Sequence, residues 1–171
     1  MRNDKGFTLI ELLIVVAIIG VIAAMAVSGL LRARIAGNEA SAIGTLRTIV
    51  SAQADYSNAN SGYAADLSAL ATACPGTTIA WISSDIDANG VTKSGYTFTI
   101  APGAGGVPGR VDCNGTPTTS TFYGTAIPIG VGSSGNRAFA INQKAAIWQD
   151  ISGVPPIEPY VVTATVSPIG R

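Results

Sequence analysis

Near its N-terminus the chain contains an uninterrupted apolar stretch. Residues 12–27 carry no charged side chain, and eleven of them are Leu, Ile, Val or Met. No polar stripe divides them, so a helix here would be apolar all round and would have to be buried on every side, in lipid or against other helices. The residues from Leu12 to Leu31 rise about 30 Å as an α-helix, which is about the thickness of a bilayer core. The pattern therefore predicts a helix that can span a membrane.

Beyond this stretch the pattern becomes that of an amphipathic helix. Apolar residues recur at intervals of three and four, which predicts a stripe that packs on a sheet. The stripe consists of Ile35, Ala42, Ile43, Leu46, Ile49 and Val50, followed by Gln53. The turn cluster Asn60-Ser61-Gly62 closes the pattern. We expect one helix from about Thr8 to Asn58, and then a short helical turn over residues 66–70 that is capped by Asp66.

The second half of the chain carries strand patterns. Residues 96–100 alternate apolar side chains with threonine, which is the clearest period of two in the sequence. Further strands are expected at 79–82, 121–127, 137–141 and 145–149, with a hairpin at 142–144 between the last two. The Gly- and Pro-rich segments 102–109 and 130–135, and the polar stretch 114–117, are expected to be loops. The proline-containing tail from Gly153 is expected to add an edge strand over 160–166 or to be flexible. This order predicts an α+β domain in which an antiparallel sheet packs on one long helix.

A single acid stands at the start of the apolar stretch. A carboxylate at membrane depth costs about 2.5 to 3.5 kcal/mol on insertion scales, so Glu11 indicates a functional site with a partner. One alternative is that the unsatisfied amides of the first helical turn stabilise it, an effect of about 0.3 to 1 kcal/mol. A desolvated amine partner would offset more of the cost of burial. The sequence therefore favours the partner.

The residues around this acid form a recognisable motif. Gly6-Phe7-Thr8-Leu9-Ile10-Glu11 follows the charged residues Arg2, Asp4 and Lys5 and runs directly into the apolar residues 12–20. This segment resembles the prepilin signature of type IV pilins and type II secretion pseudopilins. The resemblance implies the pilin-like α+β fold. One departure is Ser28, because many pilins carry a helix-kinking proline at that position.

The resemblance also implies how the chain is processed and divided. A prepilin peptidase would cut between Gly6 and Phe7 and methylate the new amine of Phe7. Glu11 would then face the Phe7 amine of a neighbouring subunit during assembly. Residues 1–6 would be a cleaved cytoplasmic leader, residues 7–34 the transmembrane and filament-core half of the helix, and residues 35–171 a globular domain in the periplasm or outside the cell.

Charge alone does not orient the chain, but the two cysteines do. Basic residues flank the apolar stretch on both sides, so the positive-inside rule does not choose between the two orientations. Cys74 and Cys113 are the only cysteines, and a lone pair in an exported domain usually forms a disulfide. Two unpaired buried thiols are the alternative. A disulfide would place the C-terminal domain outside the cytoplasm.

The amino-acid composition argues against several classes of function. Ten basic and ten acidic residues balance, which argues against a broad nucleic-acid-binding surface. Histidine is absent, so His-containing catalytic triads and His-ligated metal sites are excluded. The segment of Asp85, Asp87 and Asn89 matches the opening of a calcium loop, but the expected Glu at the twelfth position is Tyr96. The alternative for this segment is a polar hairpin turn, so no cofactor is expected apart from this calcium candidate.

Three functions fit these patterns, and the first two are not enzymatic. The first is a subunit of a type IV pilus that polymerises through its apolar helix, with adhesion, motility or DNA uptake as uses. The second is a pseudopilin of a type II secretion system. The third is a membrane-anchored exported binding domain or enzyme. For either filament the expected partners are copies of the chain, the prepilin peptidase, the inner membrane and an assembly platform. We expect a single-pass precursor in the bacterial inner membrane and, after assembly, a surface or periplasmic filament.

Overall fold

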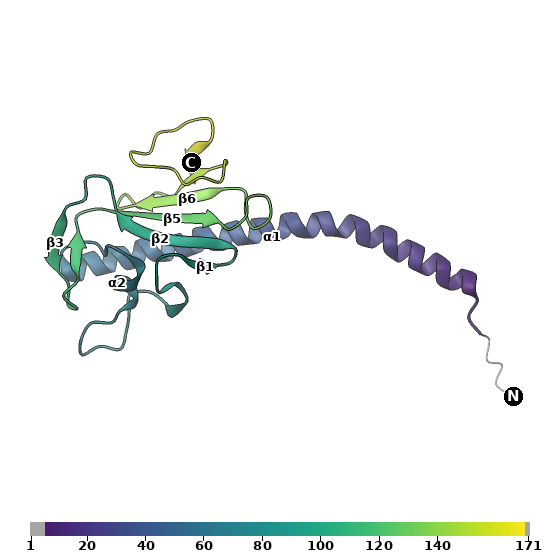
Figure 1. The fold of residues 1–171 in the computed structure, drawn as a ribbon, viewed down its shortest axis with the longest axis horizontal. Coiled ribbons are helices and arrows are strands. Elements are labelled where there is room, and N and C mark those ends of the chain that lie inside the picture. The colour runs from purple at the N-terminus through teal and green to yellow at the C-terminus, as the bar shows by residue number, and fades with distance from the viewer. Residues whose placement is uncertain (1–5, 170–171) are drawn as a thin grey trace. The chain divides into compact units, whose positions relative to one another are not determined.

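The computed structural model describes residues 6–169 of the chain (Figure 1). Arg2, Asp4, Lys5 and most of the expected leader lie outside the described residues. The chain separates into two compact units, Met1–Arg34 and Ile35–Arg171. This boundary coincides with the expected start of the globular domain, while the leader and membrane assignments of the first unit stay predictions.

One long helix is followed by a domain rich in strands. The helices are α1 (Leu9–Asn60), α2 (Leu67–Ala71) and a 3-10 helix (Ser84–Ile86). The strands are β1 (Val91–Lys93), β2 (Tyr96–Pro102), β3 (Pro108–Val111), β4 (Pro117–Thr119), β5 (Phe122–Pro128), β6 (Ala138–Asn142), β7 (Trp148–Asp150) and β8 (Val166–Pro168).

In the first unit, α1 presents apolar side chains on every side. The large apolar residues from Leu9 to Leu31 are between 44% and 77% exposed. By length and composition, this part of α1 could cross a membrane.

The predicted helix from Thr8 to Asn58 is confirmed to within two residues at each end. Ser61, with a φ of 60°, follows its last residue, as the predicted turn cluster requires.

In the second unit, a mixed architecture of helix and sheet confirms the predicted α+β class. Six strands form one sheet in the order β1-β2-β5-β6-β7-β8, and every neighbouring pair is antiparallel. β3 and β4 form a separate two-stranded sheet. Figure 1 shows the larger sheet lying along the second half of α1.

The core of this unit lies between α1 and the sheet. The predicted stripe on α1 faces this core. It meets fully buried aromatic and aliphatic side chains of the sheet: Tyr96, Phe98, Ile100, Phe122, Phe139 and Ile141. Asp66 caps α2 by accepting a hydrogen bond from the Ala69 amide, at 2.9 Å, and Leu67 and Leu70 face inward as predicted.

Gln53, the polar member of the stripe, forms hydrogen bonds to the backbone of the segment after α1. Gln53 is 0% exposed. Its Oε1 accepts a hydrogen bond from the Ala64 amide at 2.9 Å, and its Nε2 donates to the Ala64 carbonyl at 3.0 Å. The side chain therefore replaces the backbone partner that Ala64 lacks, and it holds the segment after α1 against the helix.

We predict that Gln53→Leu lowers the free energy of unfolding by about 1 to 3 kcal/mol, because it leaves two buried backbone groups without partners. Urea unfolding of the full chain in detergent micelles, followed by circular dichroism, measures the change. Gln143→Leu is the matched control, since Gln143 is exposed. Equal stability of the two variants would contradict the role of Gln53.

Two of the predicted strands, at 79–82 and 145–149, need correction. Residues 79–82 form no strand, because the Trp81 amide donates to the Leu70 carbonyl of α2 rather than to a neighbouring strand. The strand expected at 145–149 begins only at Trp148, because Ala145 takes a positive φ of 59° in the turn. The hairpin that it forms with β6 is confirmed.

Two segments predicted to be loops also need correction. β3 and β4 occupy parts of 102–109 and 114–117, and both are short strands that carry proline at their first residue, a position where proline is compatible with a strand. β1 was not predicted, since its three residues are too few to show a period.

The C-terminal segment is tied to the sheet. Of the two alternatives, the edge strand is correct, but β8 covers Val166–Pro168 rather than 160–166. The segment before β8 is also anchored, because the Tyr123 hydroxyl donates to the Pro156 carbonyl at 2.6 Å. Glu158 accepts a hydrogen bond from the Asn142 side chain, also at 2.6 Å.

Candidate assembly site and its supports

The first turn of α1 is organised by a threonine and the acid three residues later. The Glu11 amide donates to Thr8 Oγ1 at 3.3 Å, and Thr8 Oγ1 donates to Glu11 Oε2 at the same distance. The Leu12 amide donates to the Thr8 carbonyl, at 3.3 Å, as the first helical hydrogen bond. Thr8 therefore acts as the N-cap, and Glu11 lies in the first turn, where an anion is stabilised.

This geometry leaves the carboxylate able to bind a partner. Glu11 is exposed, and within residues 6–169 only one of its oxygens takes part in a hydrogen bond. No other ionisable residue occurs between Gly6 and Leu31. A cationic group of another molecule, placed against this turn, would meet one acid on an otherwise apolar surface. The pairing with the amine of Phe7 of a neighbouring subunit stays a prediction.

Gly6 and Phe7 precede the helix. Both residues are exposed and lie in a segment without regular secondary structure. A peptidase requires an accessible peptide bond, so the exposure of both residues is compatible with the expected cleavage. Cleavage between the two residues and methylation of the Phe7 amine stay predictions.

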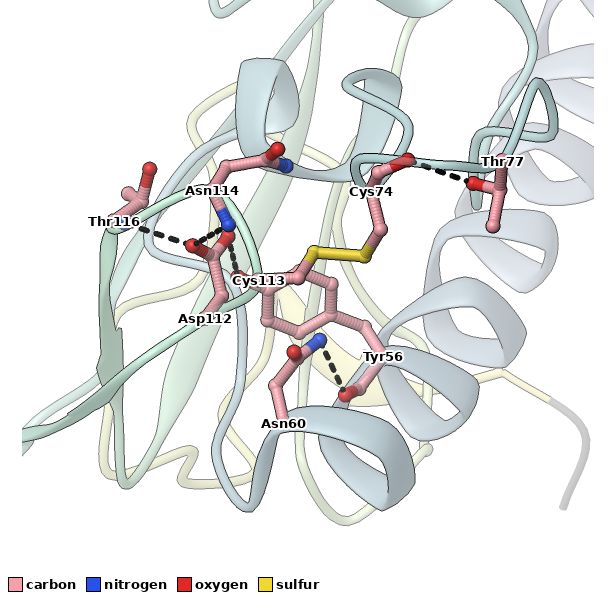
Figure 2. Close-up of a disulfide and its surroundings, with 8 residues drawn as sticks. All are labelled: Tyr56, Asn60, Cys74, Thr77, Asp112, Cys113, Asn114 and Thr116. Atoms are coloured by element: carbon pink, nitrogen blue, oxygen red, sulfur yellow. Dashed lines mark hydrogen bonds between the residues drawn. A yellow bond between two sulfur atoms is a disulfide. The ribbon is translucent and has the colours of Figure 1, made fainter.

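The two cysteines form the predicted disulfide. Cys74 and Cys113 are bonded, with a distance of 5.5 Å between their Cα atoms and a separation of 39 positions in the sequence. Figure 2 shows the bond beside the C-terminal end of α1, with Tyr56 and Asn60 of the helix close to it. The disulfide therefore joins the segment after α2 to the turn between β3 and β4.

A buried acid next to the disulfide holds the same turn, and no sequence pattern predicts it. Asp112 accepts a hydrogen bond from the Tyr56 hydroxyl at 2.8 Å, and its other oxygen accepts from the amides of Asn114 and Thr116 (Figure 2). Burial, reinforced by Asp112, raises the pKa of Tyr56 well above its usual value. Tyr56 therefore stays protonated and donates. No local pattern marks this pair, because the two residues are 56 positions apart.

A second acid connects α1 to the sheet within the globular unit. Glu39 Oε2 accepts hydrogen bonds from Nε and Nη2 of Arg137, at 2.8 and 2.6 Å. Its Oε1 accepts from the backbone amides of Asn136 and Arg137. Burial opposes ionisation of Glu39, but these hydrogen bonds and the charge of Arg137 outweigh it, so the pKa of Glu39 lies below its usual value of 4.5.

This pair should make the stability of the domain depend on pH. Because the folded pKa of Glu39 is depressed, its contribution is fully present above the unfolded value near 4.5 and is lost as the pH falls through the lower folded value. We predict that Glu39→Gln flattens this part of the acid unfolding curve of the full chain. Asp55→Asn, a change of an exposed acid on the same helix, is the control. An unchanged slope in Glu39→Gln would contradict the prediction.

The calcium candidate lies in the 3-10 helix Ser84–Ile86 and the turn before β1, not in a hairpin turn between two strands. Asp85 forms an ion pair with Lys93, at 2.6 Å, which with Ser83 lowers the pKa of Asp85. Asn89 Oδ1 accepts a hydrogen bond from the Ile100 amide at 2.9 Å, and Asn89 Nδ2 donates to the Ile100 carbonyl at 2.7 Å. Asp87 is exposed. Two of the three proposed ligands are thus engaged elsewhere.

Calcium binding stays a prediction, and a melting curve tests it. In the part of the chain that the structure describes, no three His, Cys, Asp or Glu side chains are grouped to hold a metal ion. Bound calcium would raise the melting temperature of the full chain. An identical melting temperature with calcium and with a chelator would count against the site.

Comparisons with known proteins identify a family model and a relative that resemble parts of this chain. The prokaryotic N-terminal methylation motif matches residues 1–27. The type IV wide pilus major component PilA4 of Thermus thermophilus is 46% identical to this chain over 70 residues. The match covers 41% of this chain and 53% of the relative, so the chain spans about half of the relative's length. No solved structure matches this chain significantly.

Proposed function

We propose that this chain, whose resemblance to type IV pilins the two sequence matches confirm, is the structural subunit of a type IV pilus. The observation that carries the proposal is the first half of α1, which exposes apolar side chains on all sides and holds one acid in its first turn. The relative is named as the major component of a pilus. This favours a pilin over a type II secretion pseudopilin.

The exposed helix accounts for polymerisation. Its side chains have to leave water, and either lipid or the helices of other subunits can bury them. Since lipid and neighbouring helices are similarly apolar, the helix can move from the membrane into a filament without a large hydrophobic penalty. Repeating one head-to-tail contact whose rotation does not close produces a helical polymer. One kind of chain is therefore sufficient for a filament.

Processing and location complete the proposal. The leader is removed by a prepilin peptidase between Gly6 and Phe7, and the Phe7 amine is methylated. The precursor lies in the inner membrane with its globular domain outside the cytoplasm, where the disulfide is stable. An assembly platform then transfers the chain to a surface filament, in which it acts structurally and not as an enzyme.

Imaging tests the proposal. Antibodies raised against the full chain are used for immunogold electron microscopy of the prokaryote that encodes it, with a deletion strain as the control. We expect labelled surface fibres that disappear on deletion. Cells without such fibres, in which the deletion abolishes secretion of folded proteins, would instead establish the pseudopilin function.

A further inference from the structure

The C-terminal segment forms a cavity with the hairpin of β6 and β7. The cavity has a volume of about 330 Å³. The hairpin contributes Asn142, Gln143, Lys144, Ala146 and Trp148 to its lining, and the C-terminal segment contributes Glu158, Pro159 and Tyr160, together with Ala104. Its size is within the range of small-molecule sites. The proposed assembly site, at the first turn of α1, uses none of these residues.

Two aromatic rings form one wall of the cavity. The rings of Trp148 and Tyr160 lie with their centroids 5.1 Å apart and their planes at 31°. Tyr123 lies beyond Tyr160, at a centroid distance of 6.4 Å. Trp148 and Tyr160 are only partly buried, although aromatic side chains of this size usually bury most of their surface. An apolar flat surface is therefore available to a ligand.

The hydroxyl of Tyr160 has no protein partner. Within residues 6–169 its oxygen is buried and forms no hydrogen bond. Burial, with Glu158 adding to it, raises the pKa of Tyr160 far above its usual value, so the hydroxyl keeps its proton. Buried hydroxyl groups are nearly always hydrogen-bonded, and a buried water molecule can supply this bond. A ligand in the cavity would therefore contact the ring of Tyr160 and not its buried hydroxyl oxygen.

A negatively charged side chain, Glu158, and a positively charged one, Lys144, line the same cavity. Glu158 is fixed by the Asn142 side chain at 2.6 Å and by the Ala104 amide at 2.7 Å. A carboxylate has about four acceptor positions, so Glu158 can accept further hydrogen bonds. The exposed side chains of Gln143 and Lys144 supply donors. The cavity thus combines an acceptor, several donors and an aromatic wall.

We propose that this cavity binds a neutral saccharide through one pyranose ring. A pyranose has apolar C–H faces, which pack on Trp148 and Tyr160, and a rim of hydroxyl groups, which both donate and accept hydrogen bonds. A purely apolar ligand would desolvate Glu158 and Lys144 without replacing their hydrogen bonds. A phosphate would be repelled by the Glu158 carboxylate. A neutral polyhydroxyl ring meets all of these groups at once.

Nuclear magnetic resonance of the two tryptophans tests the proposal. The full chain is placed in a detergent without a sugar headgroup and titrated to millimolar concentrations with the methyl glycosides of glucose, galactose, mannose and N-acetylglucosamine. We expect at least one of these probes to shift the indole N–H signal of Trp148 in a saturable manner. The signal of Trp81, which lies in a different pocket, serves as the internal reference and should not move.

Variants test whether the shift of the Trp148 signal comes from binding in the cavity. We expect Tyr160→Leu to weaken binding about tenfold, because it removes one of the two rings on which the sugar packs. Lys144→Ala and Gln143→Ala change exposed residues, so they test the site without disturbing the core, and they should weaken binding as well. Thr77→Ala, beside Trp81, is the matched control. The proposal is overturned if none of the four probes gives a saturable shift, if inorganic phosphate alone does, or if affinity is the same in all variants.

Discussion

Changing Glu11 to alanine should abolish fibres while leaving the precursor in the membrane. Glu11 is the one ionisable residue between Gly6 and Leu31, and its carboxylate is presented at the N-terminal turn of α1. If an amine of the adjacent subunit neutralises this acid in the filament, the variant would bury that amine without a partner. Loss of one member of a buried pair is strongly destabilising, by about 3 to 5 kcal/mol. Repeated at every subunit, this penalty should prevent polymerisation.

The measurement is a count of labelled fibres per cell, together with the amount of chain in the inner-membrane fraction. Asp55→Ala is the matched control, because Asp55 is an exposed acid on the same helix but in the globular unit. Glu11→Gln separates charge from hydrogen bonding and should behave like alanine. Normal fibre numbers in Glu11→Ala would show that the acid acts only on its own helix end.

Removing the disulfide should lower the free energy of unfolding by about 2 to 4 kcal/mol. The bond closes a loop whose ends are 39 positions apart, so its loss enlarges the conformational entropy of the unfolded chain. The melting temperature of Cys74→Ala/Cys113→Ala should therefore fall by roughly 5 to 15 °C. The hydrogen bond from Tyr56 to Asp112 remains and should keep the turn attached to α1.

Calorimetry of the full chain in detergent measures this change. A reductant supplies the control, since it should destabilise the natural chain to a similar extent and leave the double alanine variant unaffected. Adding Tyr56→Phe should then cost more in the alanine variant than in the natural chain, because two supports of the same turn are coupled. A double alanine variant as stable as the natural chain would refute a stabilising role for the bond.

The parts of the fold that follow a local pattern were predictable. The apolar run and the later stripe specify α1 because their periods extend over many residues, and Asp66 identifies the start of α2 because capping is a local interaction. β2 was predictable for the same reason. The three-residue strands were not predicted correctly, because three positions contain too little pattern and pairing with distant strands decides their extent.

The same distinction between local patterns and long-range contacts applies to the candidate functional site. Gly6, Phe7 and Glu11 stand together in one motif, so the sequence alone predicts roles for them, and these roles stay predictions. The contacts that support the globular unit depend on the folded chain, since Arg137 lies 98 positions after Glu39 and Asp112 lies 56 after Tyr56. The wall of Trp148 and Tyr160 likewise exists only because the C-terminal segment returns to the sheet.

The two outermost strands of the large sheet bear on aggregation. β1 and β8 each have a free side with backbone groups that could pair with another molecule. Both strands have only three residues, and β1 contains Lys93 while β8 ends in Pro168. Short length, a lysine and a proline are the features that discourage such pairing. In the proposed fibre, neighbouring globular domains could therefore touch without fusing into a continuous intermolecular sheet.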